Sequence, residues 1–416
     1  MRFVRERSEF LDVRVALILA ISGIALSSLG NEVFEYVLLE AGGVRLPVSP
    51  FLLGVVLAVV ALLVPWLNVW LTRRLGSVNR VLVAVQVVAG ATVCGLGVVW
   101  SGVGDSALAI TAYSICSVST AASMLASACI TIVVRNAGDD GKFTDRTAIR
   151  LISFAGTSYA FASIAGPLVG VLVSEVVPES GLIVVSGALA VAAGLAALPV
   201  RGVRGGDRGA RAQSSVRLGI RKVLGDKVIA AMLLGLSVSN LTMFGLIFAL
   251  PSYSRGLESA PLLALLLTAP VIGTLFGNLL AGLIPSRRFL VYITVFDAAL
   301  RGFCVLMLGV SRSISLSVAV LAVAGLSQGL SRVGRQTLLL DRLQREDRVL
   351  GMSAYASANR VLLPLGPAIF AMTMYWAGSA AITIQIIGVC LLVIGVLVAW
   401  RLFAPLRVIR QGATRS

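Results

Sequence analysis

Apolar stretches long enough to cross a lipid bilayer recur along this chain, and no other feature restricts its fold as strongly. A membrane-spanning helix needs about 20 predominantly apolar residues. Twelve windows meet this requirement; they begin near residues 15, 51, 80, 106, 151, 181, 228, 261, 289, 313, 349 and 379. Hydrophobic residues make up 58% of the chain and charged residues only 13%, whereas a soluble domain is roughly 45 to 50% apolar. The sequence therefore predicts an all-α, polytopic membrane protein with twelve transmembrane helices.

Basic residues are concentrated in alternate connections, and this pattern predicts the orientation. With the N-terminus inside, the inner segments hold 28 Lys and Arg, whereas the outer loops hold only Arg45, Arg255 and Arg312. Cytoplasmic loops of membrane proteins carry such an excess. We therefore expect a multi-pass protein of the cell (inner) membrane with both termini in the cytoplasm. Most of the formal net charge of +16 then reflects topology, and we expect no nucleic acid partner.

The sequence lacks the usual equipment of enzymes and metalloproteins. It contains no histidine, and its five cysteines all lie in apolar runs without a CxxC spacing. The stretch GLSQG at 325–329 fits the GxSxG pattern of serine hydrolases, but no histidine exists to activate Ser327. The stretch GDDGKFT at 138–144 lacks the spacing of a phosphate-binding loop. We therefore expect no catalytic residue, no metal, no cofactor and no ATP site.

A long basic connection divides the chain into two parts. Residues 201–227 are rich in Gly and Arg and separate six predicted spans from six. Such a composition is typical of a linker. The sequence thus predicts an N-terminal six-helix bundle over 1–200, a cytoplasmic basic linker over 201–227, and a C-terminal six-helix bundle over 228–416.

The two halves share a repeated mark. Gly166-Pro167 and Gly366-Pro367 lie 200 positions apart, and each follows an Asp-Arg pair by about 20 residues. Parallel repetition predicts two pseudo-symmetric halves related by an axis along the membrane normal, a layout typical of secondary transporters. Proline bends a helix and glycine lets a neighbouring helix approach. These four residues are therefore candidates for gating, and close packing alone is an equally good interpretation.

Twelve spans, a basic central linker and these repeats resemble the major facilitator superfamily across nearly the whole chain. The stretch VWLTRRLGSVNRVL at 69–82 is similar to the GxxxDRxGRR motif of that superfamily. Arg74 and Gly76 match the motif, whereas Val69 and Arg73 stand where Gly and Asp are expected. The resemblance implies a gating role for Arg74 and Gly76, with a weakened charge latch on the inner side.

A second likeness lies between residues 329 and 367, GLSRVGRQTLLLDRLQREDRVLGMSAYASANRVLLPLGP. The Gln336-Thr337 pair and the spacing from Arg360 to Pro364 to Gly366 resemble the branch that contains enterobactin exporters and macrolide efflux proteins. This resemblance alone implies export. It also implies a small amphipathic cargo, such as a siderophore, a macrolide-like drug or another natural product.

Acidic and amide side chains at the end of the first predicted span raise a question of cost. Asn31, Glu32 and Glu35 lie within five positions of a run that reads as membrane-spanning, and a carboxylate in hydrocarbon is expensive. One interpretation places Glu32 at the outer water interface. The other places Glu32 and Glu35 in a central cavity as proton carriers, with Asn31 beside them, because protonation removes the buried charge.

Polar residues of later spans are candidates for binding the cargo. Gln328, Arg332 and Gln336 are spaced to share one face of a helix, and Asn359 and Arg360 lie about ten residues into their span. Arg360 is the strongest candidate, because at that depth it needs a partner. Alternatively, Arg332 extends to the cytoplasm or pairs with an acid such as Asp341.

Three further polar residues are expected to be mainly structural. Asp297 and Arg301 are spaced i, i+4 and are expected to neutralise each other within one helix. Arg335 is expected to reach the cytoplasm or to pair with Asp341, as one of two equal alternatives. Asn240 is expected to bond to a neighbouring helix, although a place in the cargo cavity is the alternative.

The leading interpretation is a proton-coupled exporter, an antiporter that works as a monomer by alternating access. Its partners would be a small-molecule substrate, protons and the lipid bilayer. A non-transporting membrane scaffold or sensor descended from a transporter is an alternative, supported by the weakened motif at 69–82. An intramembrane enzyme acting on lipid-linked substrates is a further alternative, but the acidic residues are too scattered to favour it.

Overall fold

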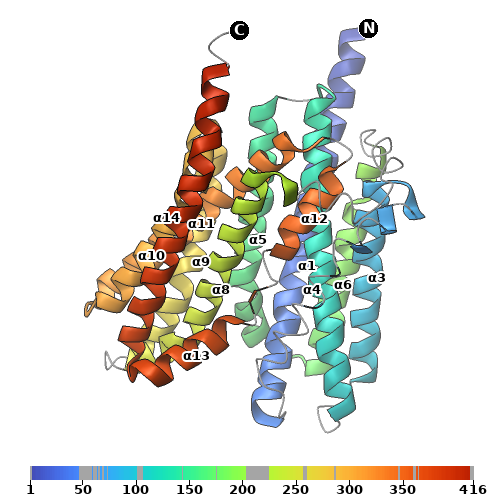
Figure 1. Ribbon diagram of the computed structural model, residues 1–416. Coiled ribbons are helices and arrows are strands. Elements are labelled where there is room, and N and C mark those ends of the chain that lie inside the picture. Colours follow the sequence, from blue (N-terminus) through green and yellow to red (C-terminus); the bar gives the residue numbers. More distant parts are fainter. Residues whose placement is uncertain are drawn as a thin grey trace. The chain divides into compact units, whose positions relative to one another are not determined.

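A computed structural model gives the structure of the chain. It describes residues 2–45, 70–72, 74–100, 106–142, 144–174, 176–202, 224–255, 260–284, 287–344, 347–358, 362–363 and 365–412, with isolated positions between 59 and 67. Within these ranges every regular element is a helix (Figure 1).

The helices follow one another along the chain with short connections. Their bounds are α1 (Arg2–Arg45), α3 (Val78–Val99), α4 (Ser106–Asp139), α5 (Asp145–Ser174), α6 (Glu179–Ala196), η1 (Leu198–Gly202), α8 (Lys227–Arg255), α9 (Ala260–Leu283), α10 (Arg287–Val310), α11 (Ile314–Arg342), α12 (Arg348–Ala358), α13 (Leu365–Ala377) and α14 (Ala380–Gly412).

Ten helical segments of the described chain are long and apolar enough to cross a membrane. They correspond to ten of the twelve predicted spans, and the all-α, multi-pass architecture is confirmed. The span predicted to begin near residue 51 falls largely outside the described residues. The span predicted near residue 349 differs, because the structure forms two shorter helices there, α12 and α13. Pro364 directly precedes α13 in the sequence, and a proline disfavours helical backbone in the residue before it.

The chain folds into two compact units. The first unit comprises Met1–Val216 together with Arg342–Ala356, and the second comprises Arg217–Asp341 together with Ser357–Ser416. Most of α12 therefore belongs to the first unit, although it follows α11 of the second unit in the sequence. The segment between α11 and α13 thus packs with helices that precede it by about 200 residues.

Small residues allow the helices of the first unit to pack closely. α1 packs against α4, α5 and α6, while α3 packs against α4 and α6. Gly90 of α3 and Gly187 of α6 lie against each other, so that a Cβ on either one would meet the other helix's backbone. Because interhelical packing in lipid depends on such close approach, these glycines position α3 and α6.

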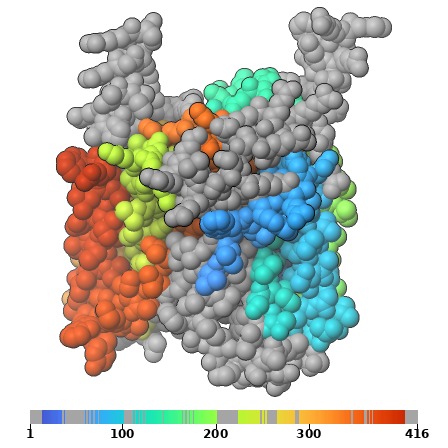
Figure 2. Space-filling model, turned by 45° about the vertical axis from the view of Figure 1, so that its right-hand side comes forward, coloured from blue at the N-terminus to red at the C-terminus, as the bar shows by residue number. Residues whose placement is uncertain are grey.

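The second unit uses the same device. α8 packs against α9, α13 and α14, and α10 packs along α14. Gly277 of α9 and Gly325 of α11 meet backbone atoms of the opposite helix, which draws α9 and α11 together. Large apolar side chains stay exposed on the outside of both bundles, including Leu172 and Trp400 at 69% each, as expected for surfaces that face lipid. The red surface in Figure 2 is the exposed side of α14 in the second unit.

Candidate functional site

Three charged side chains lie buried together inside the second unit. Asp297 and Arg301 come from α10 and Arg335 comes from α11, and their exposed fractions are 2%, 0% and 4%. Asp297 lies ten residues after the start of α10, which is about 15 Å along the axis. The three residues are therefore well inside the apolar span Phe289–Val310 and its neighbour α11. Charged groups at such positions are expensive and are usually functional.

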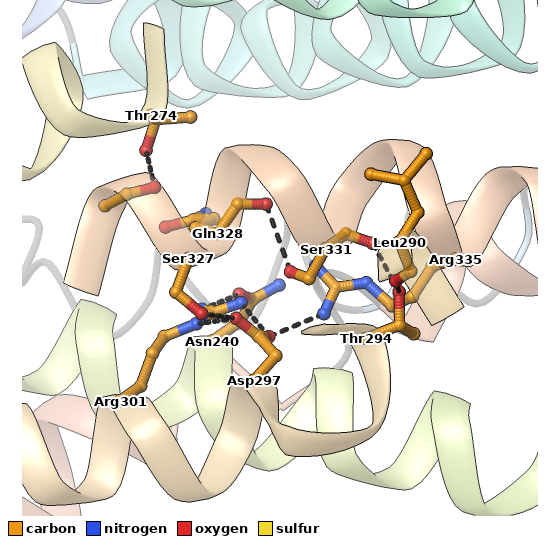
Figure 3. Close-up of polar contacts among 11 residues, drawn as sticks. Asn240, Thr274, Leu290, Thr294, Asp297, Arg301, Ser327, Gln328, Ser331 and Arg335 are labelled. Atoms are coloured by element: carbon orange, nitrogen blue, oxygen red, sulfur yellow. Dashed lines mark hydrogen bonds and ion pairs between the residues drawn. The ribbon is translucent and has the colours of Figure 1, made fainter. Parts of the chain in front are cut away.

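The carboxylate of Asp297 is the centre of this cluster (Figure 3). Arg301 donates from Nε to Oδ1 at 3.0 Å and from Nη2 to Oδ2 at 2.6 Å. Arg335 donates from Nη1 to Oδ2 at 2.7 Å, and Ser327 of α11 donates from Oγ to Oδ1 at 2.7 Å. Each carboxylate oxygen thus accepts two hydrogen bonds, and one anion is shared by two guanidinium groups.

Neighbouring polar groups extend the cluster to α8. Arg301 also donates from Nη1 to Oδ1 of Asn240 at 3.5 Å, so Asn240 contacts the cluster from α8. Thr294 of α10 donates to the backbone of α10 at Leu290 and to the backbone of α11 at Ser331. α10 and α11 approach closely here because Gly334 lies directly against Thr294. Small and hydroxyl-bearing residues therefore make room for the charged side chains.

This cluster corrects two expectations from the sequence. Asp297 and Arg301 do pair within α10, but the pair is not self-contained, because Arg335 shares the same carboxylate. Arg335 does not extend to the cytoplasm; it is buried against α10. The physical reason is the face of α11 on which it lies: Ser327, Ser331 and Arg335 are spaced i, i+4, i+8 and all face α10. This spacing was a signal in the sequence that pointed to the cluster.

The face of α11 predicted to bind cargo lies one residue further along. Gln328 and Arg332 are half-buried, and Gln336 is buried. These residues are not among the groups that bond to Asp297, so α11 carries two adjacent polar faces. Asn359 and Arg360, the other predicted binding residues, lie outside the described residues.

The polar stripe of α1 turns toward other helices of the first unit. Ser27 donates to Oε1 of Gln86 on α3 at 2.6 Å, and Ser119 of α4 donates to Oδ1 of Asn31 at 2.5 Å. Glu32 is half-buried, and its side chain lies directly against Gly166 of α5. The side chain of Glu35 is outside the described part of the structure. The structure thus brings Asn31 and Glu32 into contact with α4 and α5.

The two glycines of the Gly-Pro pairs occupy corresponding places. Gly166 of α5 packs on α1 at Leu29 and Glu32, whereas Gly366 of α13 packs on α8 at Leu241 and Gly245. A Cβ on either glycine would collide with the partner helix. The side chains of Pro167 and Pro367 are not described. The repeat in the sequence therefore marks equivalent helix contacts in the two units.

A second charged cluster lies in the first unit, where α12 meets the end of α4. Arg348 of α12 donates from Nη1 to Oδ1 of Asn136 at 2.7 Å and to Oδ2 of Asp139 at 2.5 Å. Arg135 pairs with Asp139 at 3.4 Å and with Asp145, at the start of α5, at 2.9 Å. Charged side chains thus join the ends of α4, α5 and α12. No sequence motif indicated this contact.

The predicted gating loop before α3 has a simpler structure. The guanidinium carbon of Arg74 lies 5.9 Å from the centre of the Trp70 ring, a cation–π contact on an exposed side chain. Gly76 has φ of 73°, a left-handed conformation that suits glycine. It is followed by Ser77, which caps α3. Gly76 is therefore explained by the turn.

No metal site is apparent in the part of the chain that the structure describes. Within that part, no three His, Cys, Asp or Glu residues gather as metal ligands. The five cysteines are free thiols.

Comparison with known proteins gives a fold. No protein-family model and no curated protein matches the chain, but many solved structures do. A bacterial homologue of the iron transporter ferroportin is similar with a TM-score of 0.67 and 15% identity, covering 93% of this chain and 98% of that one. The human organic anion transporter MFSD10 gives 0.66 and 14%, covering 94% and 99%.

The proton:xylose symporter XylE, described as a major facilitator superfamily protein, gives a TM-score of 0.64 at 12% identity and covers 94% of this chain and 95% of that one. These similarities extend over nearly the full length of each protein. The chain thus has the fold of major facilitator transporters.

Proposed function

We propose that this chain, which has a major facilitator fold, is a secondary active transporter. In this proposal it is a proton-coupled exporter of a small amphipathic molecule and works by alternating access. The observation that carries the proposal is the cluster of Asp297, Arg301 and Arg335, buried at mid-span in a bundle of that fold. A purely structural bundle gains little from three buried charges, because desolvation offsets most of their attraction.

The similar structures are consistent with a small cargo. By their titles, one is an organic anion transporter, another couples xylose to protons, and a third is related to an iron transporter. The fold thus accommodates several cargo classes. Export, and a siderophore, macrolide-like drug or other natural product as cargo, are proposed from the sequence resemblance at residues 329 to 367.

Proton coupling is assigned to Glu32 and Glu35. Glu32 is half-buried against α5, and the stripe beside it bonds to α3 and α4. A carboxylate in this environment reduces its cost by taking up a proton. Asn31, Asn240, Gln328, Arg332, Gln336, Asn359 and Arg360 are assigned to cargo binding, and Asn240 is supported by its contact with Arg301.

Gating is assigned to the Gly-Pro pairs and to the contacts of Arg348. Gly166 and Gly366 allow close helix approach in corresponding places, as a rocking motion of two bundles requires. The loop before α3 lacks the acid of the superfamily motif, and Arg348 with Asp139 supplies a charged contact between α12 and α4 instead. We propose that this contact does the work of the weakened loop motif, together with Arg74 and Gly76.

The test is transport by the purified protein in lipid vesicles. We expect an imposed pH gradient to drive a labelled macrolide or a catecholate siderophore across the vesicle membrane. Replacing both acids, in Glu32→Gln/Glu35→Gln, should abolish the dependence on the pH gradient. Glu179→Gln is the matched control, because Glu179 is an exposed carboxylate at the start of α6.

Unchanged pH-driven transport in the double variant would refute the proton assignment. A folded wild-type protein that moves neither compound would favour a scaffold or sensor. The predicted orientation, with both termini cytoplasmic, is tested separately by reporter fusions at each terminus. The predicted monomer is tested by the mass of the purified protein in detergent.

A further inference from the structure

We propose that Arg301 and Arg335 form an anion-binding site for the cargo, and that Asp297 fills this site in the present structure. The inference rests on the proposed transport function and specifies its substrate class. That class is an organic anion with an oxyanion group, either a carboxylate or a phosphate.

The charges of the cluster carry the first step. Two guanidinium groups, from Arg301 and Arg335, share the single carboxylate of Asp297. A guanidinium does not lose its proton in proteins, so these three residues together bear one excess positive charge. A buried cation is stabilised by a paired anion. The cluster therefore attracts a second anionic group whenever one gains access.

The geometry indicates which contact is exchangeable. Asp297 and Arg301 lie one turn apart on α10 and make a two-point contact, which any movement of α10 carries along intact. Arg335 reaches Asp297 from α11 through one nitrogen. A shift of α11 relative to α10 therefore separates Arg335 from Asp297 first. An incoming oxyanion then takes the place of Asp297 on Arg335.

The neighbouring donors suit an oxyanion. Ser327 donates its hydroxyl to the same carboxylate and lies two turns from Arg335 on the same face of α11. Gln328 and Arg332 lie on the adjacent face of α11 and are half-buried. Guanidinium groups recognise carboxylate and phosphate with directed hydrogen bonds. The same donors offer nothing to a cationic drug, so the site distinguishes organic anions from amphipathic cations.

The first test replaces the built-in anion with one from solution. Asp297→Ala removes the carboxylate and leaves space for a small ion. The midpoint of thermal unfolding is measured for the purified protein with potassium formate, potassium phosphate or potassium chloride at equal ionic strength. We expect formate or phosphate to raise the midpoint of this variant by about 3 °C or more above its value in chloride, with no such difference in the wild type.

The double variant Asp297→Ala/Arg335→Gln is the control and should lose the response. No response in Asp297→Ala, or an equal response without Arg335, would overturn the inference. A response to formate alone identifies a carboxylate site, and a response to phosphate identifies a site for the larger group. If Asp297→Ala does not fold, Asp297→Ala/Arg301→Gln replaces it, because that variant keeps Arg335 and the native excess of one positive charge.

A second test concerns cargo. Vesicles containing the wild-type protein or Arg335→Gln are offered coumarin-3-carboxylate and coumarin-3-carboxamide, which share an aromatic body and differ in charge. We expect the wild type to move the carboxylate at least tenfold faster than the amide, and Arg335→Gln to lose this preference. Equal movement of both, or movement of neither, overturns the anion inference. The transporter proposal is decided separately, by pH-driven movement of the macrolide or siderophore.

Discussion

Unequal stability of two single variants is the most direct consequence of the shared carboxylate. Asp297→Asn removes the only anion among the three charged residues of the cluster and leaves Arg301 and Arg335 facing a neutral amide. Arg335→Gln instead leaves one carboxylate paired with one guanidinium, through the two hydrogen bonds from Arg301 at 3.0 and 2.6 Å. The two substitutions each change one charge, but only the first leaves buried charges without a counterion.

The expected magnitudes differ by several kcal/mol. Removing one partner of a buried ion pair costs about 3 to 5 kcal/mol, and Asp297→Asn affects two pairs at once. Arg335→Gln loses one hydrogen bond to a charged group but relieves the excess charge, so we expect a change of about 1 kcal/mol or less. For a unit of this size, each kcal/mol shifts the midpoint of thermal unfolding by about 2 to 4 °C. Asp297→Asn should thus unfold roughly 6 to 20 °C below the wild type.

The measurement is thermal unfolding of the purified protein in detergent, followed by size-exclusion chromatography of the fraction that remains folded. The double variant Asp297→Asn/Arg335→Gln should recover part of the loss, because only Arg301 then lacks a counterion. If Arg335→Gln destabilises the protein as much as Asp297→Asn does, the charge-sharing argument is wrong.

Two further perturbations test other contacts of the structure. Arg348→Gln removes the hydrogen bonds to Asn136 and Asp139, so amide hydrogen exchange in α12 should become about tenfold faster or more while exchange in α3 stays constant; unchanged exchange in α12 would contradict a holding role. Gly366→Ala places a Cβ against the backbone of α8 and should destabilise the protein by about 1 to 3 kcal/mol, measured by the same thermal assay. Gly95→Ala, at an exposed helical position with open space around it, should be neutral or slightly stabilising; equal losses in the two glycine variants would refute the packing argument.

Parts of the candidate site were visible in the sequence and parts were not. The pair of Asp297 and Arg301 follows from helical spacing, and the structure contains it. The third member, Arg335, was assigned to the wrong environment, because spacing along α11 shows which residues share a face but not which helix that face meets. The repeated glycines behaved differently: their equivalence in the sequence corresponds to equivalent contacts on α1 and α8.

The sequence by itself determined the fold class and the places of most membrane-spanning helices. This is possible because the apolar length that a bilayer requires is a local property, which each segment carries independently of its neighbours. The tertiary structure alone decided which charges meet. Arg348 contacts Asp139 across 209 positions of sequence, and Arg335 shares the carboxylate of Asp297 with Arg301. Such partnerships depend on helix packing, and in lipid that packing is set by close contact of small residues from distant segments.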